Sequence, residues 1–311
     1  MKDTILVTGI TGFLGSHIGK MLCENDYKVF ATRRQKSILK NCCDYEDKIS
    51  WINVDEDDWK DRAIAVAPAT IVHAAWTGVA ATERDDWELQ TENLSFLQDL
   101  LDIAQRSNSH KIIGLGSQAE YGRADKIISE SGPLRPSNAY GALKIVASEM
   151  IKQFAHLHQV SWSWCRVFSV FGENEAPDWL LPSVIQNMLA KKKGMDFSPG
   201  DQEYAYLYVK DFAEAIEKVI TSTEAPSGCY NISGIQPLAL KDIITLIRNS
   251  INQDFQLNFG ALPYRDNQST LVAGDMALYN KTFGTLPTTP LEQSIQNTIE
   301  FYTSNLPNEG I

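Results

Sequence analysis

The sequence predicts an α/β protein with a doubly wound parallel sheet and a smaller C-terminal lobe. Through the first half of the chain, apolar β-rich runs alternate with helical patterns, which is typical of strands joined by crossover helices. These runs are almost continuously apolar, as strands covered on both faces are. The chain has 311 residues, of which 43% are hydrophobic, so it is long enough to bury a large core.

Each element can be placed on the sequence. We expect strands at residues 4–9, 27–32, 49–54, 70–75 and 111–117. Helical patterns cover residues 13–25 and 87–106. After about residue 170, proline and glycine become more frequent and the strand patterns shorter, which predicts the smaller lobe.

Two later segments are expected to return to the first domain. A helical pattern covers residues 207–220, and a strand pattern covers residues 228–233. We therefore predict a first domain of residues 1–168, with returning segments near residues 208–233, and a lobe made of residues 169–207 and 234–311.

Composition and charge narrow the function classes. The net charge of −11 argues against nucleic acid or an anionic membrane as the main partner. No run approaches the roughly 20 apolar residues of a membrane span, and the first residues lead into a strand rather than a signal-peptide pattern. The five scattered cysteines have no metal-ligand spacing, so we predict no metal site and a reducing, cytoplasmic location.

The turn after the first strand predicts a dinucleotide site. The stretch "VTGITGFLG" puts Gly9, Gly12 and Gly15 between a strand and a helix. The first glycine allows a tight turn, the second allows close approach of a pyrophosphate, and the third allows the helix to pack on the sheet. The helix N-terminus adds free N–H groups and a positive dipole end. Residues 1–168 are thus expected to form a Rossmann-like dinucleotide-binding domain.

A tyrosine and a lysine one helical turn apart predict acid–base chemistry. Tyr140 and Lys144, in "AYGALK", share one face of a helix. A nearby ammonium favours the phenolate and is expected to lower the pKa of Tyr140. Ser117 ends a buried strand, where ligands bind in open sheets, and its hydroxyl suits a substrate carbonyl oxygen. Tyr206 and Lys210 have the same spacing in a strand-like context, where plain packing is expected.

Taken in order, these motifs resemble the extended short-chain dehydrogenase/reductase family, which includes nucleotide-sugar epimerases, dehydratases and 4-ketoreductases. The resemblance rests on "TGITGFLG", "HAA", "GSQAEYG", "YGALK", "RVFSVFG" and "YVKDFAEAI", and it covers nearly the whole chain. It implies that Ser117, Tyr140 and Lys144 are the catalytic residues. It also implies a nucleotide-sugar held by the C-terminal lobe, and a homodimer built on the helices near residues 86–107 and 138–157.

The resemblance implies further contacts. Cofactor contacts are expected from Gly9, Thr11, Gly12, Phe13, Leu14, Gly15, Arg33, Arg34, Asp55, His73, Ala74, Ala75, Tyr140, Lys144, Val167 and Val170. Substrate contacts are expected from Trp76, Gln118, Ser169, Trp179 and Arg265. Asp55 is the residue expected at the adenine. A hydrogen-bonded core histidine is the alternative reading of His73, and core packing is the alternative for Trp76 and Trp179.

Two departures from the family pattern affect the diphosphate site. Ser169 stands where family members commonly have an asparagine that meets the nucleotide diphosphate. Tyr204 and Ala205 stand where many carry Arg-Asp, so one expected phosphate-binding cation is missing. Arg265 matches a second family arginine and is expected to carry that role alone.

The paired arginines Arg33 and Arg34 bear on the cofactor. An acid after the second strand binds the ribose 2′-hydroxyl of NAD, whereas an arginine there accommodates the 2′-phosphate of NADP. NADP(H) is therefore favoured, with NAD(H) as the alternative. The competing reading is that both arginines simply open a solvated loop.

These observations predict NADPH-dependent reduction of the 4-keto group of a nucleotide-linked 4-keto-6-deoxy sugar. Tyr140 would protonate the new alkoxide, Ser117 would polarise the carbonyl, and Lys144 would hold the ribose and tune Tyr140. Dehydration is disfavoured, because Gln118 and Ala119 follow Ser117 where dehydratases carry an acid–base pair, and Glu120 is expected on the loop surface. The alternatives are an NAD-retaining 4-epimerase, a non-catalytic NADP-binding module, and an enzyme for another carbonyl compound such as a flavonoid-type ketone.

Overall fold

The computed structural model describes residues 3–265 and 268–305 and contains a seven-stranded parallel sheet. The sheet strands are β1 (Thr4–Thr8), β2 (Lys28–Arg33), β3 (Ser50–Asn53), β4 (Thr70–His73), β5 (Lys111–Ser117), β6 (Ser161–Val167) and β11 (Gly228–Ile232). Their order is β11-β6-β5-β4-β1-β2-β3. The chain order reverses between β1 and β4, which is the kind of position where open α/β sheets bind ligands. The predicted doubly wound fold is confirmed.

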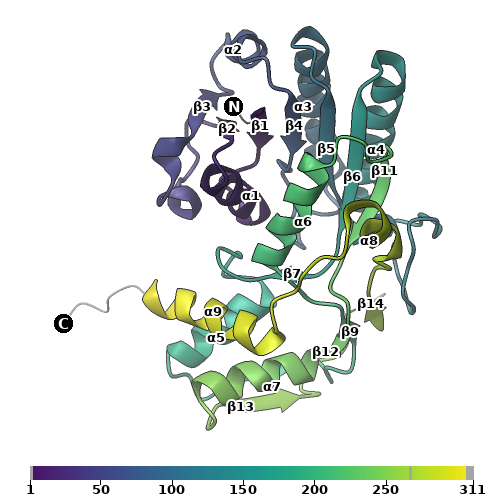
Figure 1. Ribbon diagram of the computed structural model, residues 1–311. Helices are drawn as coiled ribbons and strands as arrows, with labels where there is room; N and C mark the ends of the chain where they lie inside the picture. Colours follow the sequence, from purple (N-terminus) through teal and green to yellow (C-terminus); the bar gives the residue numbers. More distant parts are fainter. Residues whose placement is uncertain (1–2, 266–267, 306–311) are drawn as a thin grey trace.

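Helices cover both faces of this sheet (Figure 1). They are α1 (Phe13–Glu24), α2 (Trp59–Ala65), α3 (Trp87–Arg106), α4 (Ala139–His158) and α6 (Val209–Thr221). The neighbours Leu6 and Val7 of β1 are both fully buried, and they lie in different cores. Val7 shares its core with α1 and α6, whereas Leu6 shares its core with α3 and α4. Burial on both faces explains why the strand sequences are continuously apolar.

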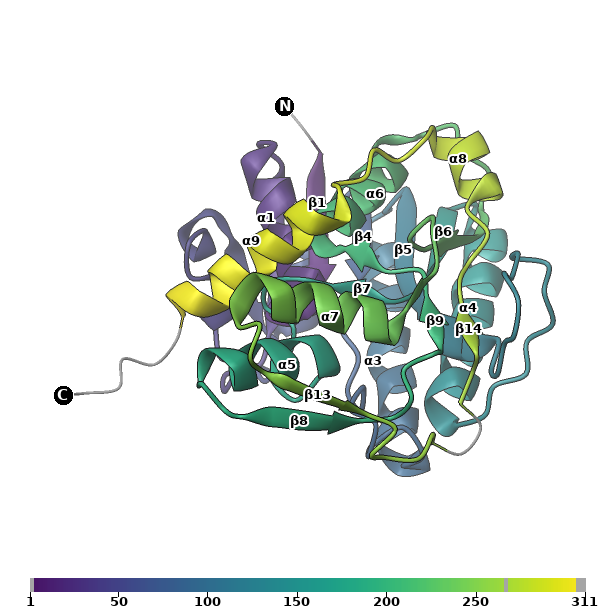
Figure 2. The same cartoon turned by 90° about the horizontal axis from the view of Figure 1, so that it is seen from below.

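A smaller lobe lies beyond the carboxyl ends of the strands (Figures 1 and 2). Its helices are α5 (Leu180–Leu189), α7 (Leu240–Ile251) and α9 (Leu291–Ser304). Its short strands are β7 (Val170–Phe171), β8 (Gly194–Phe197), β9 (Glu203–Tyr204), β10 (Leu207–Tyr208), β12 (Leu238–Ala239), β13 (Gln256–Phe259) and β14 (Leu271–Val272). The three helices share one apolar core, and Figure 2 shows them gathered on one side of the molecule.

Segments from the second half of the chain pack on the first-half sheet. β11 pairs in parallel with β6, and α6 packs on α1. Helix α8 (Ala277–Phe283) also packs against β11, and its Tyr279 and Phe283 lie in the same core as α1. The division at residue 168 remains a prediction, but the sheet itself is built from non-contiguous parts of the chain. None of the helices in the described ranges is long and apolar enough to cross a bilayer.

Candidate active site

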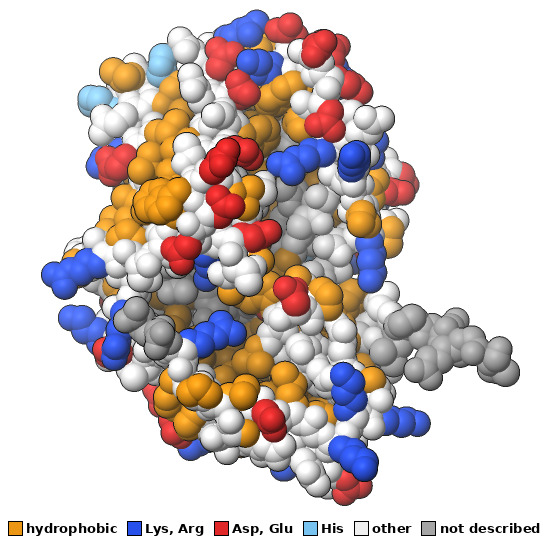
Figure 3. Space-filling model, turned by 180° about the vertical axis from the view of Figure 1, so that it is seen from behind, with side chains coloured by type: hydrophobic (Ala, Val, Ile, Leu, Met, Phe, Trp, Pro, Cys, Tyr) orange, Lys and Arg blue, Asp and Glu red, His pale blue; other side chains and the backbone are white. Residues whose placement is uncertain are grey.

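A cleft of about 1510 Å³ runs between the sheet and the lobe. Its walls come from the carboxyl ends of β1, β5 and β6 on one side and from α5 and α9 on the other. Seen from behind, the molecule is hollowed between these two parts (Figure 3). Pockets for one drug-sized ligand span roughly 300–1,000 Å³, so this cleft has room for two ligands side by side.

The three glycines of the first turn have different surroundings. Gly9 has φ +73°, and a Cβ there would lie 2.5 Å from the backbone nitrogen of Ala75. A Cβ on Gly15 would lie 2.1 Å from the carbonyl oxygen of Gly9, so both positions need glycine for packing. A Cβ on Gly12 would meet only that same oxygen, at 3.3 Å, and Gly12 lines the cleft. No side chain caps the start of α1. An open backbone cradle at a helix N-terminus fits a dinucleotide pyrophosphate.

Ser117 and Tyr140 come together on the cleft wall, with Lys144 behind them. Ser117 is the last residue of β5, and Tyr140 is the second residue of α4, whose start is capped by Asn138. Asn138 accepts a 2.8 Å hydrogen bond from the amide of Gly141. The Lys144 Nζ donates to the carbonyl of Leu115 at 2.7 Å and lies 3.8 Å from the ring centroid of Trp76.

The protonation of this set differs from the sequence-based expectation. Burial raises the pKa of Tyr140, and this effect exceeds the lowering caused by a hydrogen bond with Ser117 and by the charge of Arg84. The expected lowering of the Tyr140 pKa is therefore wrong. Lys144 does not produce it, because its own pKa is lowered to about 7 by burial, with Glu120 acting in the opposite direction.

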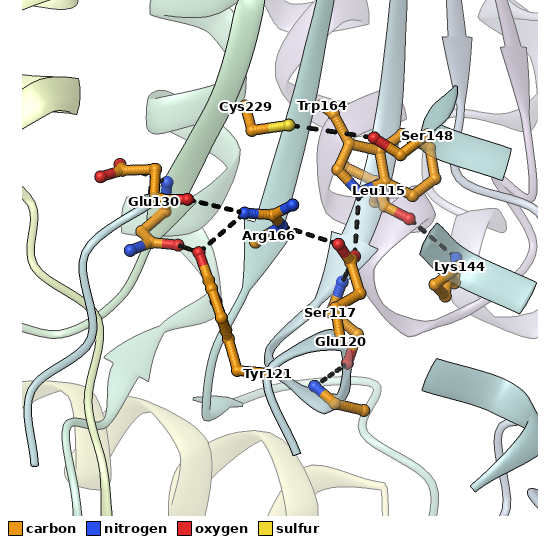
Figure 4. Close-up of polar contacts among 12 residues, drawn as sticks. Leu115, Ser117, Glu120, Tyr121, Glu130, Lys144, Ser148, Trp164, Arg166 and Cys229 are labelled. Atoms are coloured by element: carbon orange, nitrogen blue, oxygen red, sulfur yellow. Dashed lines mark hydrogen bonds and ion pairs between the residues drawn. The ribbon is translucent and has the colours of Figure 1, made fainter. Parts of the chain in front are cut away.

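Glu120 is the clearest correction to the sequence analysis. It is fully buried rather than exposed on a loop, and its Oε2 pairs with the Arg166 Nε at 2.7 Å. Its Oε1 accepts hydrogen bonds from the Trp164 Nε1 at 2.9 Å and from the Ser117 backbone amide at 2.8 Å. Figure 4 shows Glu120 between Arg166 and the backbone of Ser117. This carboxylate thus fixes the strand end that carries Ser117.

His73 ends β4 beneath the cleft. Its Nδ1 shares a 3.0 Å hydrogen bond with the Thr8 hydroxyl, and its Nε2 is buried without a hydrogen-bond partner among the described residues. Burial, with a smaller effect of Lys144, lowers the pKa of His73 to about 3, so the ring is neutral. Of the next two residues, Ala74 lines the cleft and Ala75 donates its amide to the Thr8 hydroxyl.

The residues expected at the adenosine end lie at the carboxyl ends of β2 and β3. The Arg33 guanidinium lies 5.2 Å from the Trp51 ring centroid, and the Arg34 Nη2 donates to the Thr77 hydroxyl at 3.2 Å. The Asp55 carboxylate accepts a 2.7 Å hydrogen bond from the amide of Gln35. Within the described residues, neither arginine forms an ion pair with a carboxylate.

Most of the remaining expected site residues line the cleft, whereas Arg33, Arg34 and Asp55 lie outside its lining. On the cofactor side these are Phe13, Leu14, Val167 and Val170, and on the substrate side Trp76, Gln118, Ser169 and Trp179. Thr11 is half-buried, and its carbonyl accepts a hydrogen bond from Asn41. Arg265 is exposed and outside the cleft lining, although its charge lowers the pKa of Tyr204 against the larger effect of burial. Lys210 forms an ion pair with Glu173 at 2.9 Å, and this pair does not involve Tyr140.

Several lining residues were missed by sequence reasoning, among them Arg84 and Glu175. Arg84 lies in the loop before α3, with its guanidinium 5.0 Å from the Tyr140 ring centroid. Glu175 is buried, one of its carboxyl oxygens has no partner among the described residues, and burial raises its pKa to about 8. Both stand in charged or proline-containing stretches that look like ordinary surface loops, so no local pattern marks them.

The fold and the site together define the class of NAD(P)-dependent short-chain dehydrogenases and reductases. A glycine turn opens onto a cleft that also holds a serine and tyrosine backed by a lysine. The sequence matches the model of the "NAD dependent epimerase/dehydratase family" over residues 5–233. The chain belongs to this family of NAD-dependent enzymes.

Similar proteins extend over almost the whole chain. UDP-glucuronate 4-epimerase 1 of Arabidopsis thaliana is 24% identical, covering 97% of this chain and 77% of its own. Among solved structures, UDP-glucose 4-epimerase from Thermotoga maritima has a TM-score of 0.87 at 20% identity, covering 98% of this chain and all of that one. UDP-glucuronic acid 4-epimerase from Bacillus cereus, solved with UDP-glucuronic acid and NAD, has a TM-score of 0.84 at 20% identity, covering 97% and 99% of the two chains. These structural matches establish the shared fold.

Proposed function

We propose that this enzyme reduces the 4-keto group of a nucleotide-linked 4-keto-6-deoxy sugar with NADPH. The observation that carries the proposal is the Arg33–Arg34 pair at the end of β2, which has no carboxylate partner among the described residues. An unpaired arginine there favours a 2′-phosphate. NADP pools serve net reduction, whereas an epimerase has no need for a consumable reductant.

The side chains of the cleft support this chemistry. When bound, the nicotinamide supplies the hydride chemistry. The Tyr140 hydroxyl is suited to donate a proton to the sugar oxygen at C4, and the Ser117 hydroxyl to donate a hydrogen bond to the same oxygen. Lys144 would hold the nicotinamide ribose, and the Gly12 cradle and first turn of α1 would hold the pyrophosphate.

A 4-epimerase that retains NAD is the second candidate. The relatives and solved structures named above are 4-epimerases, and one of them was solved with NAD. Such an enzyme would use the same Ser117, Tyr140 and Lys144, because oxidation and reduction at C4 move the same proton. The cofactor distinguishes the two candidates, and Arg33 at the end of β2 supports NADPH.

We also propose a cytoplasmic homodimer that binds a nucleotide-sugar. All five cysteines lie in the described ranges and are free thiols, as a reducing compartment favours. On the outer helices α3 and α4, Trp87 is 60% exposed, and Val146 and Leu157 are also exposed. Large apolar side chains exposed on two adjacent helices support an interface there.

The test follows the absorbance of NADPH and NADH with a panel of 4-keto-6-deoxy nucleotide-sugars. Oxidation of NADPH alone supports the reductase. Interconversion of 4-hydroxyl epimers without cofactor turnover supports the epimerase, and no conversion of any sugar supports a binding module. Arg33→Asp should shift preference toward NADH by at least tenfold, because a carboxylate repels the 2′-phosphate. Lys36→Asp is a matched control, since it changes charge in the same loop.

A further inference from the structure

The guanidinium of Arg84 lies beside the Tyr140 ring and has no carboxylate partner among the described residues. Its Nε donates to the carbonyl of Val79 at 3.0 Å. Within the described residues, neither of its Nη nitrogens has a hydrogen-bond acceptor, and no carboxylate lies within ion-pair distance. The side chain is half-buried and lines the cleft. Its planar edge, with the donors suited to bidentate recognition, is therefore unpaired.

The position of this guanidinium is fixed by both walls of the cleft. The amide of Tyr140 donates to the carbonyl of Arg84 at 2.9 Å, which ties the loop to the start of α4. The guanidinium carbon lies 5.0 Å from the Tyr140 ring centroid and 5.7 Å from that of Trp179, the residue that precedes α5 on the lobe side. Cation–π contacts with two rings hold the group in place without using its Nη donors.

The charge of Arg84 is not balanced inside the cleft. Glu175 is the acidic residue among the described lining residues, and burial raises its pKa to about 8, so it is largely neutral at pH 7. Arg84 is the arginine among the described lining residues, which also include Lys40, Lys191 and Lys192, and it is the one placed against the Tyr140 ring. Tyr204 occupies the position where the family pattern has a phosphate-binding arginine. A cation that is unpaired, held in place and next to the reacting site calls for an anionic partner from the substrate.

We propose that Arg84 binds an oxyanion of the nucleotide-sugar beside Tyr140, either a carboxylate on the sugar or the phosphate that adjoins the sugar. This inference rests on the proposed function, because it assumes that a nucleotide-sugar occupies the cleft with its C4 at Tyr140. Both oxyanions lie within the breadth of one sugar ring from C4. A carboxylate source would make the substrate a uronic acid in place of the proposed 6-deoxy sugar, whose C6 is a methyl group. A phosphate source fits the 6-deoxy sugar and makes Arg84 the replacement for the missing family arginine.

The test measures ligand binding without turnover. Full-length protein carrying Tyr140→Phe, which keeps the ring that Arg84 packs on, is titrated by calorimetry with UDP-, dTDP-, GDP- and CDP-hexoses and with the matching uronates. For the nucleotide whose hexose or uronate binds most tightly, three ligands are then compared: the nucleotide-hexose, the matching nucleotide-uronate and the nucleoside diphosphate alone. The same titrations are repeated with Arg84→Gln, with Arg84→Lys and with the control Arg248→Gln, whose guanidinium donates hydrogen bonds to exposed Asn249.

We expect Arg84→Gln to raise the dissociation constant at least tenfold, and Arg84→Lys to recover most of that loss because it keeps the charge. A loss confined to the uronate identifies the carboxylate, and an equal loss for hexose, uronate and diphosphate identifies the phosphate. Dissociation constants within twofold of the parent protein for both Arg84 variants overturn the proposal. If neither a nucleotide-hexose nor a nucleotide-uronate of any of the four bases binds the parent protein, the nucleotide-sugar assignment itself fails, which is a separate outcome. Unchanged NADPH binding by Arg84→Gln verifies that the variant is folded, and Arg84→Lys serves as the charge test if it is not.

Discussion

At the scale of single residues, burial is the largest cause of the pKa shifts of Tyr140, Lys144 and Glu175. An unfolded lysine titrates near pH 10.4, whereas burial lowers the pKa of Lys144 to about 7. The folded protein therefore disfavours the protonated amine. That cost is fully present below pH 7 and is relieved as the pH rises from 7 toward 10.4, because the unfolded chain then binds more protons.

Replacing Lys144 with methionine isolates this effect. The free energy of unfolding of the wild type, relative to Lys144→Met, should increase by about 2 kcal/mol between pH 7 and pH 9. Urea denaturation of the cofactor-free protein at several pH values measures it. Lys152→Met removes an exposed lysine and should show no such change. A flat difference for Lys144→Met would mean that water solvates its ammonium.

In the proposed reaction, the Tyr140 hydroxyl is the proton donor, so its removal is expected to affect turnover rather than stability. Tyr140→Phe removes the proton donor but keeps the ring that contacts Trp76 edge-on at 6.2 Å. Turnover should fall at least a hundredfold, in line with the size of acid–base contributions, while NADPH affinity stays within twofold. Steady-state kinetics and fluorescence titration measure the two quantities. Full activity in this variant would refute the proton-donor role.

At the scale of elements, one buried ion pair joins β5, the 3₁₀ helix η3 (Gln118–Glu120) and β6. Glu120 accepts hydrogen bonds from the amide of Ser117 and from Trp164, and it pairs with Arg166. Arg166 also donates to the Tyr121 hydroxyl at 3.0 Å. Because these contacts cross three elements, they couple the position of Ser117 to the neighbouring strand.

Removing the charge of Glu120 should therefore destabilise the protein strongly. Glu120→Gln leaves the buried Arg166 without a counter-ion, and breaking such a pair costs about 3–5 kcal/mol. Glu149→Gln is the matched control, because it breaks an exposed pair with Lys152 worth at most about 1 kcal/mol. Urea denaturation of both variants at pH 7 measures the difference. Equal midpoints would show that water reaches Arg166.

At the scale of the whole molecule, the first-half sheet needs the second half of the chain. β11 covers the edge of β6, and α6 fills the groove beside α1. A fragment of residues 1–168 lacks both, so it exposes a strand edge and an apolar helix face. The first-half elements are therefore not expected to form a stable unit alone.

Two truncations test this dependence. Residues 1–168 should be insoluble or lack a cooperative thermal transition. The full chain should unfold cooperatively, and adding the separate peptide 207–233 to the refolding fragment should recover part of the near-ultraviolet circular dichroism. A cooperative transition in residues 1–168 alone would show that β6 tolerates an open edge.

Features that depend on neighbouring residues were predicted correctly from the sequence, whereas features that depend on contacts between distant segments were missed. The strand at 111–117 and the helix at 87–106 were predicted at the bounds seen in the structure, because apolar periodicity is a local property. Ser117 and Tyr140 were predicted from local motifs and do line the cleft. Arg84 and Glu175 were missed, because they lie in loops that only the folding of the chain brings to the cleft. Arg84 reaches the Tyr140 ring in this way.

The sequence alone determined the alternation of strands and helices, the glycine turn and the Ser117, Tyr140 and Lys144 set. Each depends on residues close together in the chain or on motifs with fixed spacing. Only the tertiary structure decided the burial of Glu120 against Arg166, the raised pKa of Tyr140 and the unpaired charge of Arg84. Those properties depend on which distant groups exclude water from a side chain, and desolvation is a property of the packed molecule rather than of a stretch of sequence.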